Sequence, residues 1–324
     1  MSIISAKDDL LHAAPNDHYT WTETNWFGLM AIPEERLQFE PYVWLHPNLK
    51  VAYAGFYAAS GVKKDQLACE YWDFRSWLPF PAGNLDEYRL DNGLSVKILK
   101  PLTAYQIDYV DAERKTELHV TWDATMPPVP FPMGEHLEQT GRVRGALVLD
   151  GRERKVDFLS IRDHSWVFRP ETPKMGRRPI AMVSCGFDPE FSVCLTLPDS
   201  AYTRSGAVTE APGWLAQASV KPSEFVPFCW VQKGSSIRQV RSAWQRTTRD
   251  PTGFRPTRVE AEFVDDHDEK YTLTGEVVNM VPFHWMQNNM IRTCLTRFEC
   301  NGRNAWGNFA ESLENDVVRE LLTQ

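Results

Sequence analysis

The sequence Arg142-Val-Arg-Gly-Ala-Leu-Val-Leu149, followed by Asp150-Gly151 and by Arg152-Glu-Arg-Lys-Val-Asp-Phe158, decides the fold class. Apolar and polar residues alternate on both sides of the Asp-Gly pair, as they do in strands that bury one face. The Asp-Gly pair supplies the positive backbone angles that a two-residue hairpin turn requires. The stretch therefore predicts two antiparallel strands joined by a tight turn.

Similar alternating runs occur along the whole chain and are separated by clusters of turn residues. Further strands are predicted over residues 51–57, 94–99, 105–110, 116–122, 180–187, 191–197, 213–220, 258–263 and 270–278. Helical patterns are few. Residues 235–246 would place Ile237, Val240 and Trp244 on one face of a helix of about three turns, and residues 312–322 fit a closing helix. We therefore expect an all-β fold with few short helices.

Two proline-rich passages interrupt this pattern. The first, Met126-Pro-Pro-Val-Pro-Phe-Pro-Met133, cannot occupy a central strand because proline has no backbone N–H to donate, so we expect an ordered loop or lid. The second, residues 170–179, separates two sets of predicted strands. A chain of 324 residues is longer than one core usually fills. We therefore expect domains of residues 1–172 and 173–324, each of a size that suits one small antiparallel barrel.

Composition and charge disfavour several classes of protein. The chain has 35 basic and 43 acidic residues and a formal net charge of −8, so nucleic acid is not an expected partner. No uncharged apolar run is long enough to span a membrane. Lys7, Asp8 and Asp9 stand where a signal peptide needs an apolar segment, so we expect a cytoplasmic protein. The six cysteines are scattered and are expected to be reduced thiols.

The aromatic content is high, with 12 Trp, 10 Tyr and 17 Phe residues. Tryptophan fills large volumes and can line an apolar pocket while its N–H remains hydrogen-bonded. This content fits a densely filled β core, and it also fits a cavity for a bulky apolar ligand. Composition alone slightly favours the filled core.

The densest polar cluster is Ser160-Ile-Arg-Asp-His-Ser-Trp-Val-Phe-Arg169. Alternation along a strand sends Asp163 to one face and both Arg162 and His164 to the other. Asp163 could orient His164 or pair with Arg169, and either arrangement would shift pKa values toward acid–base chemistry. The same residues could form a buried salt-bridge network, and the two roles are compatible.

Other candidate residues are more isolated. Glu311 ends the stretch Trp306-Gly-Asn-Phe-Ala-Glu311, where it is either a general acid inside an aromatic barrel or a solvated side chain, and the pattern favours the solvated position. Near the start of the chain, alternation groups Trp21 with Glu23, which is a further catalytic candidate. Candidate substrate-binding residues are Trp21, Trp72, Trp166, His284, Trp285 and Trp306.

Several kinds of site are not indicated. The eight histidines are singletons without an HxH or HExxH motif, so no metal site is predicted. No glycine-rich phosphate loop follows a predicted strand, and no Gly-x-Ser-x-Gly nucleophile elbow is present. No cysteine stands in a catalytic motif.

The signature Arg162-Asp-His-Ser-Trp166, followed by Arg169, belongs with the opening Trp21-Thr-Glu-Thr-Asn-Trp-Phe27 and the closing 306–311 stretch. With these three stretches the chain resembles the two-domain lipocalin-like superfamily of carotenoid 1,2-hydratase (hydroxyneurosporene synthase) and AttH-like proteins. It is most similar to the branch with an Arg-Asp-His-Ser-Trp signature. It departs from that branch at Val167, where glycine is usual, and at Asn308, where an aliphatic residue is commoner.

The resemblance implies two consecutive lipocalin-like antiparallel β-barrels with a ligand cavity near their junction. Relatives include cofactor-independent hydratases and cyclases that act on terpenoid or polyketide substrates. An aromatic cavity suits such chemistry because it stabilises carbocation-like charge while a few acids move protons.

The leading hypothesis is a cofactor-independent lyase or isomerase. It would hydrate, dehydrate, cyclise or rearrange a hydrophobic terpenoid, steroid or aromatic substrate. Asp163 and His164 would form the acid–base pair, with Arg169 fixing Asp163. Glu311 and Glu23 are the further candidates for the proton donor.

In this hypothesis Trp166, Trp306 and Trp72 line the cavity. One alternative is a non-catalytic lipocalin-like carrier of a hydrophobic metabolite, in which the polar signature is structural. Another is an interaction module whose exposed aromatic residues form a protein interface, for example in a homodimer.

Overall fold

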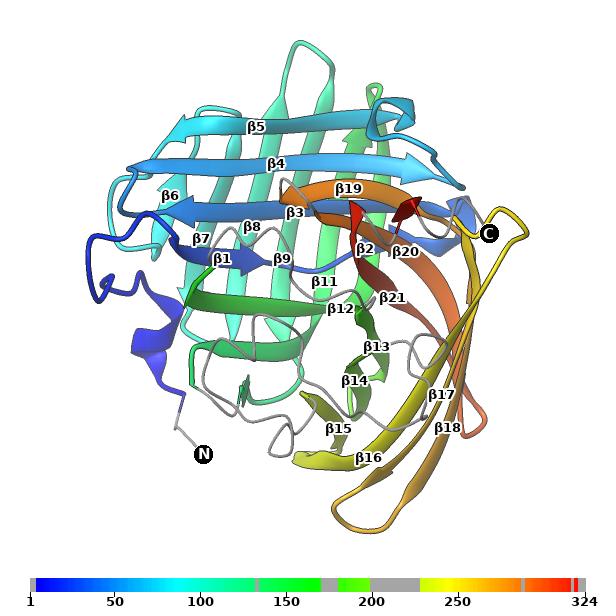
Figure 1. Cartoon of the computed structure of the whole chain (residues 1–324). Helices are drawn as coiled ribbons and strands as arrows, with labels where there is room; N and C mark the ends of the chain where they lie inside the picture. The colour runs from blue at the N-terminus through cyan, green and yellow to red at the C-terminus, as the bar shows by residue number, and fades with distance from the viewer. Residues whose placement is uncertain are drawn as a thin grey trace. The chain divides into compact units, whose positions relative to one another are not determined.

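The computed structural model describes residues 4–131, 134–169, 180–198, 228–286, 289–315 and 318–319 of the chain, and these residues form an almost entirely β structure (Figure 1). The all-β prediction is confirmed. The chain divides into two compact units, Met1–Ser60 with Cys69–Glu171 and Gly61–Ala68 with Thr172–Gln324. The predicted boundary between residues 172 and 173 lies outside the described residues.

The strands of the first unit are β1 (Trp21–Trp26), β2 (Met30–Ile32), β3 (Leu37–His46), β4 (Val51–Ser60), β5 (Tyr71–Pro79), β6 (Glu87–Arg89), β7 (Leu94–Lys100), β8 (Ala104–Asp111), β9 (Thr116–Ala124), β10 (Val129–Pro130), β11 (His136–Leu149) and β12 (Arg152–Phe168). Those of the second unit are β13 (Ile180–Asp188), β14 (Phe191–Pro198), β15 (Cys229–Lys233), β16 (Ser236–Arg249), β17 (Pro256–Asp265), β18 (Lys270–Val277), β19 (Val281–Met286), β20 (Asn289–Cys300) and β21 (Arg303–Glu314). Short 3₁₀ helices are η1 (Ala6–Asp9), η2 (Pro33–Glu35) and η3 (Gln66–Ala68).

The first unit is built on a 12-stranded sheet in the order β5-β4-β3-β1-β12-β11-β9-β8-β7-β6, with β2 beside β3 and β10 beside β11. The sheet coils so that β3, β4 and β5 cross over β7, β8 and β9 (Figure 1), which makes a half-barrel that stays open between β5 and β6. Its inner face is filled by apolar side chains that include Phe39, Val43, Phe56, Ile107 and Trp122. We call the opposite side of the sheet its outer face.

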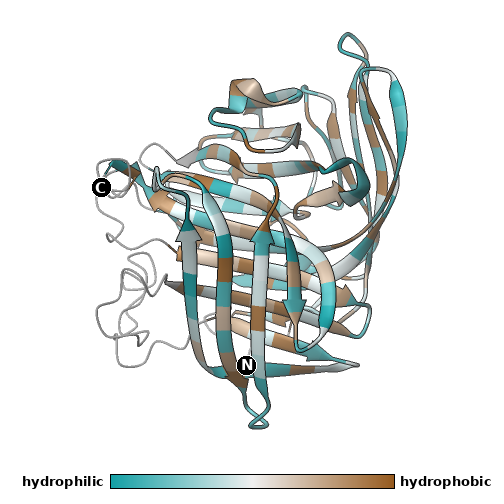
Figure 2. Ribbon diagram, turned by 90° about the vertical axis from the view of Figure 1, so that its right-hand side faces the viewer, coloured by the Kyte–Doolittle hydropathy of each residue, from teal (hydrophilic) through white to brown (hydrophobic). Residues whose placement is uncertain are grey.

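The second unit is a closed barrel. Its strands follow the order β18-β17-β16-β15-β14-β13-β21-β20, and a further pairing of β18 with β20 closes the ring of eight, while β19 adds to β20. Apolar residues including Val183, Val193, Phe263, Leu273 and Phe298 fill the interior. Hydrophobic and hydrophilic residues alternate along many strands (Figure 2), as expected for sheets with one packed face.

The hairpin predicted around Asp150-Gly151 is confirmed. β11 pairs with β12 in antiparallel register, and the final pair, Leu149 with Arg152, leaves a two-residue turn. Asp150 and Gly151 have φ angles of 54° and 72°, the positive values that the turn needs. This long hairpin places the polar signature in the middle of the first unit's sheet.

The helix predicted over residues 235–246 is wrong, because this segment is the strand β16. It pairs with β15 on one side and with β17 on the other, so its backbone N–H and C=O groups form hydrogen bonds with both neighbours. The register with β17 shifts between Val240 and Ser242, which marks a β-bulge. The extra residue of a bulge breaks the period of two, and here it leaves apolar residues at a spacing that imitates a helix.

Other predicted segments fall partly or wholly outside the described residues. These are the strand over 213–220, residues 132–133 of the first proline-rich passage, and the second passage over 170–179. The closing helix predicted from residue 312 starts later, because β21 continues to Glu314, while the described residues 315, 318 and 319 are helical. Residues 316–317 and 320–322 of that prediction also lie outside the described part.

A short segment within the first half of the sequence, Gly61–Ala68, belongs to the second unit. Val62 forms a parallel bridge with Met280, and the backbone N–H of Lys63 donates to the Met280 carbonyl at 2.8 Å. The N–H of Gly61 donates to the side-chain oxygen of the fully buried Asn279 at 3.0 Å. The second unit is therefore assembled from two separate stretches of sequence.

All six cysteines are free thiols, and five of them are buried, as the sequence predicted. Burial raises the pKa of the Cys185 thiol well above its ordinary value and favours its neutral form. Within the described residues, no helix combines the length and the apolar character needed to cross a membrane.

Gly28 offers a test of the packing of β12. Its φ is +75°, and a Cβ added there would lie 2.0 Å from the Ile161 carbonyl oxygen and 2.3 Å from Ser160 Oγ. We expect Gly28→Ala to lower the free energy of unfolding by roughly 2–4 kcal/mol, measured by urea denaturation, because backbone strain and overpacking add. Gly151→Ala is the matched control, with φ of +72° and nothing closer than 3.8 Å. An equal loss in both variants would contradict the steric account.

Candidate functional site

β12 carries the Arg-Asp-His-Ser-Trp signature between β1 and β11, and the pleat of the strand sends successive side chains to opposite faces of the sheet. His164 is aligned, through β1, with Val43 of the apolar core, so His164 and Arg162 belong to the inner face. Asp163 lies opposite Trp26 of β1 and belongs to the outer face. The two faces hold separate groups of ionisable residues.

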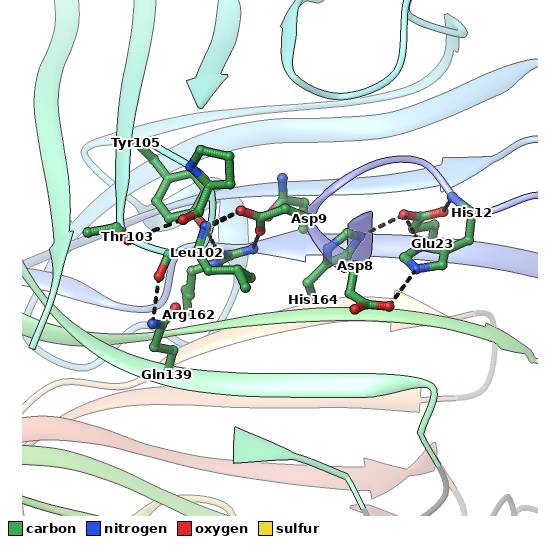
Figure 3. Close-up of polar contacts among 12 residues, drawn as sticks. Asp8, Asp9, His12, Glu23, Leu102, Thr103, Tyr105, Gln139, Arg162 and His164 are labelled. Carbon is green, nitrogen blue, oxygen red and sulfur yellow. Dashed lines mark hydrogen bonds and ion pairs between the residues drawn. The ribbon is translucent and has the colours of Figure 1, made fainter. Parts of the chain in front are cut away.

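The group on the inner face, which we call the inner network, consists of Asp9, His12, Glu23, Tyr105, Arg162 and His164. Arg162 is only 1% exposed, and its Nη2 donates to Asp9 Oδ1 at 2.7 Å (Figure 3). The Tyr105 hydroxyl contacts Arg162 Nη1 and donates to Asp9 Oδ2 at 2.6 Å. Burial opposes ionisation of Asp9, but the Arg162 charge and the hydrogen bonds outweigh burial and lower the pKa of Asp9.

The second half of the inner network is centred on Glu23, which is fully buried. His164 donates from Nε2 to Glu23 Oε1 at 2.7 Å, and His12 Nδ1 lies 3.1 Å from the same oxygen (Figure 3). The backbone N–H of His12 donates to the other carboxylate oxygen at 3.0 Å. Burial by itself would raise the pKa of Glu23, but the contacts with the two histidines lower it. Trp166 stacks on the His12 ring with centroids 3.7 Å apart.

The inner network joins four parts of the chain. Asp9 and His12 come from the N-terminal segment, Glu23 from β1, Tyr105 from β8, and Arg162 with His164 from β12. Because both carboxylates have lowered pKa values and charged or N–H partners, they are poor proton donors near neutral pH. The arrangement is suited to hold the N-terminal segment against the sheet.

This geometry differs from the expected pairing of Asp163 with His164. Adjacent residues of a strand project to opposite faces, so Asp163 cannot orient the His164 ring. Glu23, which is 141 residues away in sequence, takes that role. Glu23 was anticipated as a proton donor, and its contacts instead place it as the acceptor for both histidines.

On the outer face, Glu40 and Asp163 form what we call the outer carboxyl pair. Glu40 of β3 is 4% exposed and accepts hydrogen bonds from Trp26 Nε1 at 2.8 Å and from the Tyr57 hydroxyl at 3.2 Å. Gln38 donates to the same hydroxyl at 2.9 Å. Burial raises the pKa of Glu40 to about 7, the two hydrogen bonds oppose that rise, and the charge of Asp163 adds to it.

Asp163 lies on β12 opposite Glu138 of β11, and His136 follows on the same face. Its Oδ1 is buried and has no hydrogen-bond partner among the described residues. Burial raises the pKa of Asp163 to about 6, and the positive charges of His136 and Arg169 oppose this rise. The side chain is therefore less firmly held as an anion than the carboxylates of the inner network.

Arg169 stands just beyond the end of β12. It donates hydrogen bonds to Thr22 Oγ1 at 2.5 Å and to Ser165 Oγ at 2.6 Å. Its charge favours the ionised form of Asp163. Arg169 thus influences Asp163 through its charge, while these two hydroxyl contacts fix its own position. That Arg169 fixes Asp163 for catalysis stays a prediction.

Aromatic rings continue the outer face beyond Glu40. Tyr57 stacks with Trp72 at 5.6 Å between ring centroids, and Trp72 contacts Phe74 at 4.8 Å. Two carboxyl groups with raised pKa values beside such rings can exchange protons with an apolar molecule near neutral pH. Perturbed carboxyl groups of this kind often mark functional sites, so the outer carboxyl pair is the candidate active site.

Glu311, in the second unit, is fully buried. It lies on the face of β21 that carries the core residue Phe309, so the solvated position favoured by the sequence is wrong. Arg249 donates to its carboxylate, and Arg292 Nη1 lies 3.7 Å from it. Glu311 is therefore held by two arginine side chains inside the second unit.

The predicted substrate-binding residues are dispersed. Trp166 and Trp21 pack with Leu137 in a small buried cluster on the inner face, and Trp72 lies on the outer face. Trp306 is partly exposed on the side of β21 opposite Phe309, and His284 is exposed on β19. The side chain of Trp285 lies outside the description. Among those whose side chains the structure describes, Trp72 adjoins the outer carboxyl pair through Tyr57.

Glu40, Trp26 and Tyr57 were missed in the sequence. Pro41, next to Glu40, interrupts an otherwise regular strand pattern and concealed β3. β2 pairs with residues 37–39 of β3 and β1 with residues 42–45, so the proline lies where the partner changes from one strand to the other. The alternation of Gln38, Glu40 and Tyr42 within an apolar run is the signal that could have revealed this face.

The chain matches a known protein family over most of its length. Residues 5–316 match the family described as "Domain of unknown function (DUF7064)". The chain belongs to this family. No curated protein matches the sequence of this DUF7064 member.

Several solved structures are similar to this DUF7064 protein. An AttH-like protein from Nitrosomonas europaea is 10% identical, with a TM-score of 0.62 and 96% of each chain covered. CghA, crystallised with Sch210972, is 11% identical, with a TM-score of 0.55 over 91% of this chain and 88% of that one. Kievitone hydratase from Nectria haematococca is 10% identical, with a TM-score of 0.47 over 91% and 88%. The likeness to the first two confirms the lipocalin-like, AttH-like fold, and at such identities it establishes the fold alone.

The inner network predicts a specific dependence of stability on pH. Asp9→Asn leaves Arg162 buried without a counter-charge, so the free energy of unfolding at pH 7 should fall by about 3–5 kcal/mol. The folded-state pKa of Asp9 is lowered, so this stabilisation is present above its ordinary value of 3.8 and is lost as the pH falls through the folded-state value. Urea denaturation of the parent protein and of Asp9→Asn should show that their free energies of unfolding become more similar below about pH 4.

Asp157→Asn is the control for this experiment. Asp157 lies on β12, as Arg162 does, and it pairs with Arg142. Both side chains of this pair are about one-third exposed. Exposed pairs contribute less than about 1 kcal/mol. If the two variants lost equal stability, the inner network would not be the anchor described above.

Proposed function

We propose that this protein is a cofactor-independent lyase or isomerase. It hydrates, dehydrates, cyclises or rearranges a hydrophobic terpenoid, steroid or aromatic substrate by acid–base catalysis. The observation that carries the proposal is the buried Glu40 carboxyl group, which is held by Trp26 and Tyr57 beside a second carboxyl group, that of Asp163.

Reactions of this class add a proton at one carbon and remove one from another atom. A carboxyl group is an efficient donor and acceptor when its pKa is close to the working pH, and the pKa of Glu40 is about 7. We assign Glu40 as the proton donor and Asp163, on the neighbouring part of the outer face, as the acceptor. Arg169 is a positioning residue that favours the anionic form of Asp163.

The aromatic rings supply the second requirement of such a reaction. Protonation of an alkene creates positive charge on carbon, and the faces of Trp and Tyr rings attract positive charge. Tyr57 and Trp72 stack next to Glu40, so they would contact the substrate where this charge develops. The fold is compatible with an organic ligand, since the related CghA structure contains Sch210972.

The inner-face residues take no part in proton transfer under this proposal. The inner face of β12 is held by the contacts of His164 with Glu23 and Trp166. These contacts support the strand that carries Asp163 on its outer face. Glu311 with its two arginines is likewise left out of the reaction.

Turnover provides the direct test. A panel of terpenoid, steroid and phenolic alkenes is incubated with the protein in D2O and analysed by mass spectrometry and NMR. We expect a product that has gained or lost water, or an isomer with deuterium on carbon. Glu40→Gln and Asp163→Asn should each lower kcat by about 10²–10⁴-fold, whereas Asp157→Asn should leave it unchanged. A compound that binds and is recovered without any change would identify a carrier instead.

The raised pKa of Glu40 also predicts how stability depends on pH, and this can be tested without a substrate. Its folded-state pKa is raised, so between pH 4.5 and about 7 the folded state binds a proton that the unfolded state has lost, and stability falls as the pH rises. Above pH 7 the folded protein holds a desolvated carboxylate. Glu40→Gln should therefore raise the free energy of unfolding at pH 8, by up to about 3 kcal/mol, and have little effect at pH 4. A variant that is less stable than the parent at pH 8 would contradict the raised pKa.

A further inference from the structure

We propose that His12, Glu23 and His164 form a binding site for one divalent transition-metal ion of the Zn²⁺ class. His12 offers Nδ1, His164 offers Nε2, and Glu23 offers a carboxylate oxygen, and all three atoms lie within 4.8 Å of one another. Both ring nitrogens point at the same atom, Glu23 Oε1, at 3.1 and 2.7 Å. Two of the three donors therefore point at the third, and all three lie close enough together to share one ion (Figure 3).

The donor types match such an ion. Two imidazole nitrogens and one carboxylate oxygen are ligands that Zn²⁺, Co²⁺ and similar ions accept, with bonds of about 2.0–2.2 Å. A tetrahedral ion with such bonds separates its ligand atoms by about 3.3 Å. The 2.7 and 3.1 Å contacts need to open by only a few tenths of an ångström to admit the ion. An ion needs the lone pairs of His12 Nδ1 and His164 Nε2, so on binding each neutral ring would carry its proton on its other nitrogen, Nε2 of His12 and Nδ1 of His164.

The surroundings of the three donors fix their orientation. Trp166 is stacked on His12 at an angle of 5° and stands edge-on to His164, with centroids 5.2 Å apart. The distal nitrogen of His12 has no hydrogen-bond partner among the described residues, and Asp8 Oδ1 lies 3.8 Å from it. A small movement of Asp8 would form the carboxylate–histidine hydrogen bond that commonly supports a metal-bound histidine. The charges of Glu23 and Asp8 together balance those of a divalent cation.

The position of the site indicates its role. Its ligands come from the N-terminal segment, from β1 and from β12, so a bound ion would fasten the segment to the sheet. The site lies on the inner face, opposite Asp163 and Glu40, so the ion has no part in the proposed reaction. This inference is independent of the proposed function and departs from the expectation of no metal site, because the ligands at positions 12, 23 and 164 form no local motif.

Metal titration tests the proposal. The full chain, free of any polyhistidine tag and stripped with a chelator, is titrated separately with ZnCl2 and CoCl2. We expect one equivalent to bind with a Kd on the order of 1 μM or lower, the visible absorption of a low-coordinate Co²⁺ site, and a rise in Tm with added Zn²⁺. Failure of both ions to bind at one equivalent would overturn the proposal.

Variants locate the bound ion. His12→Gln should weaken binding by more than about 100-fold, and His12 is 19% exposed, so its replacement leaves the core intact. Asp8→Asn, which keeps all three ligands, should weaken binding by about 10–100-fold. The matched control is His119→Gln, which removes an exposed histidine that contacts Asp108 and Glu117. Binding that is lost in His119→Gln and kept in His12→Gln would refute the site.

Discussion

A buried guanidinium group needs a compensating negative charge, and in this protein Asp9 supplies it for Arg162. Arg162 is 1% exposed and Asp9 2% exposed, so neither charge could remain in the folded chain without the other. Asp9 belongs to a segment that makes only one short helical turn, whereas Arg162 belongs to the longest strand. The ion pair therefore converts an N-terminal extension into part of the half-barrel and fixes the inner surface of β12.

The pleat of β12 sends the side chains of the signature alternately to the two faces of the first unit's sheet. Arg162 and His164 are bound into the inner network, where the carboxylates are ionised and paired. Asp163, between them, projects to the opposite face, where burial favours its neutral form. The stability gained on one face permits an unfavourable carboxyl environment on the other, and such a local cost is typical of a functional site.

The sequence was informative where the physics is local. Asp150-Gly151 determines its turn through backbone conformation, and the alternation of Arg162, Asp163 and His164 depends only on the strand. The partners of these residues were not predictable, because Asp9 and Glu23 meet β12 from 153 and 141 residues away. Glu40 was concealed by Pro41, and β16 was mistaken for a helix because a bulge shifts its apolar pattern. In each case a non-local pairing overrode the local signal.

The segment Gly61–Ala68 has a consequence for dissecting this molecule. A polypeptide cut at the sequence midpoint would carry the closed ring of strands but not the eight residues that dock on Met280 and Asn279. Asn279, which is fully buried in the intact chain, would then lose the backbone N–H that its amide oxygen accepts. Independent expression of the C-terminal half therefore calls for a graft of the missing octapeptide, and gene fusion or duplication of either half would meet the same obstacle.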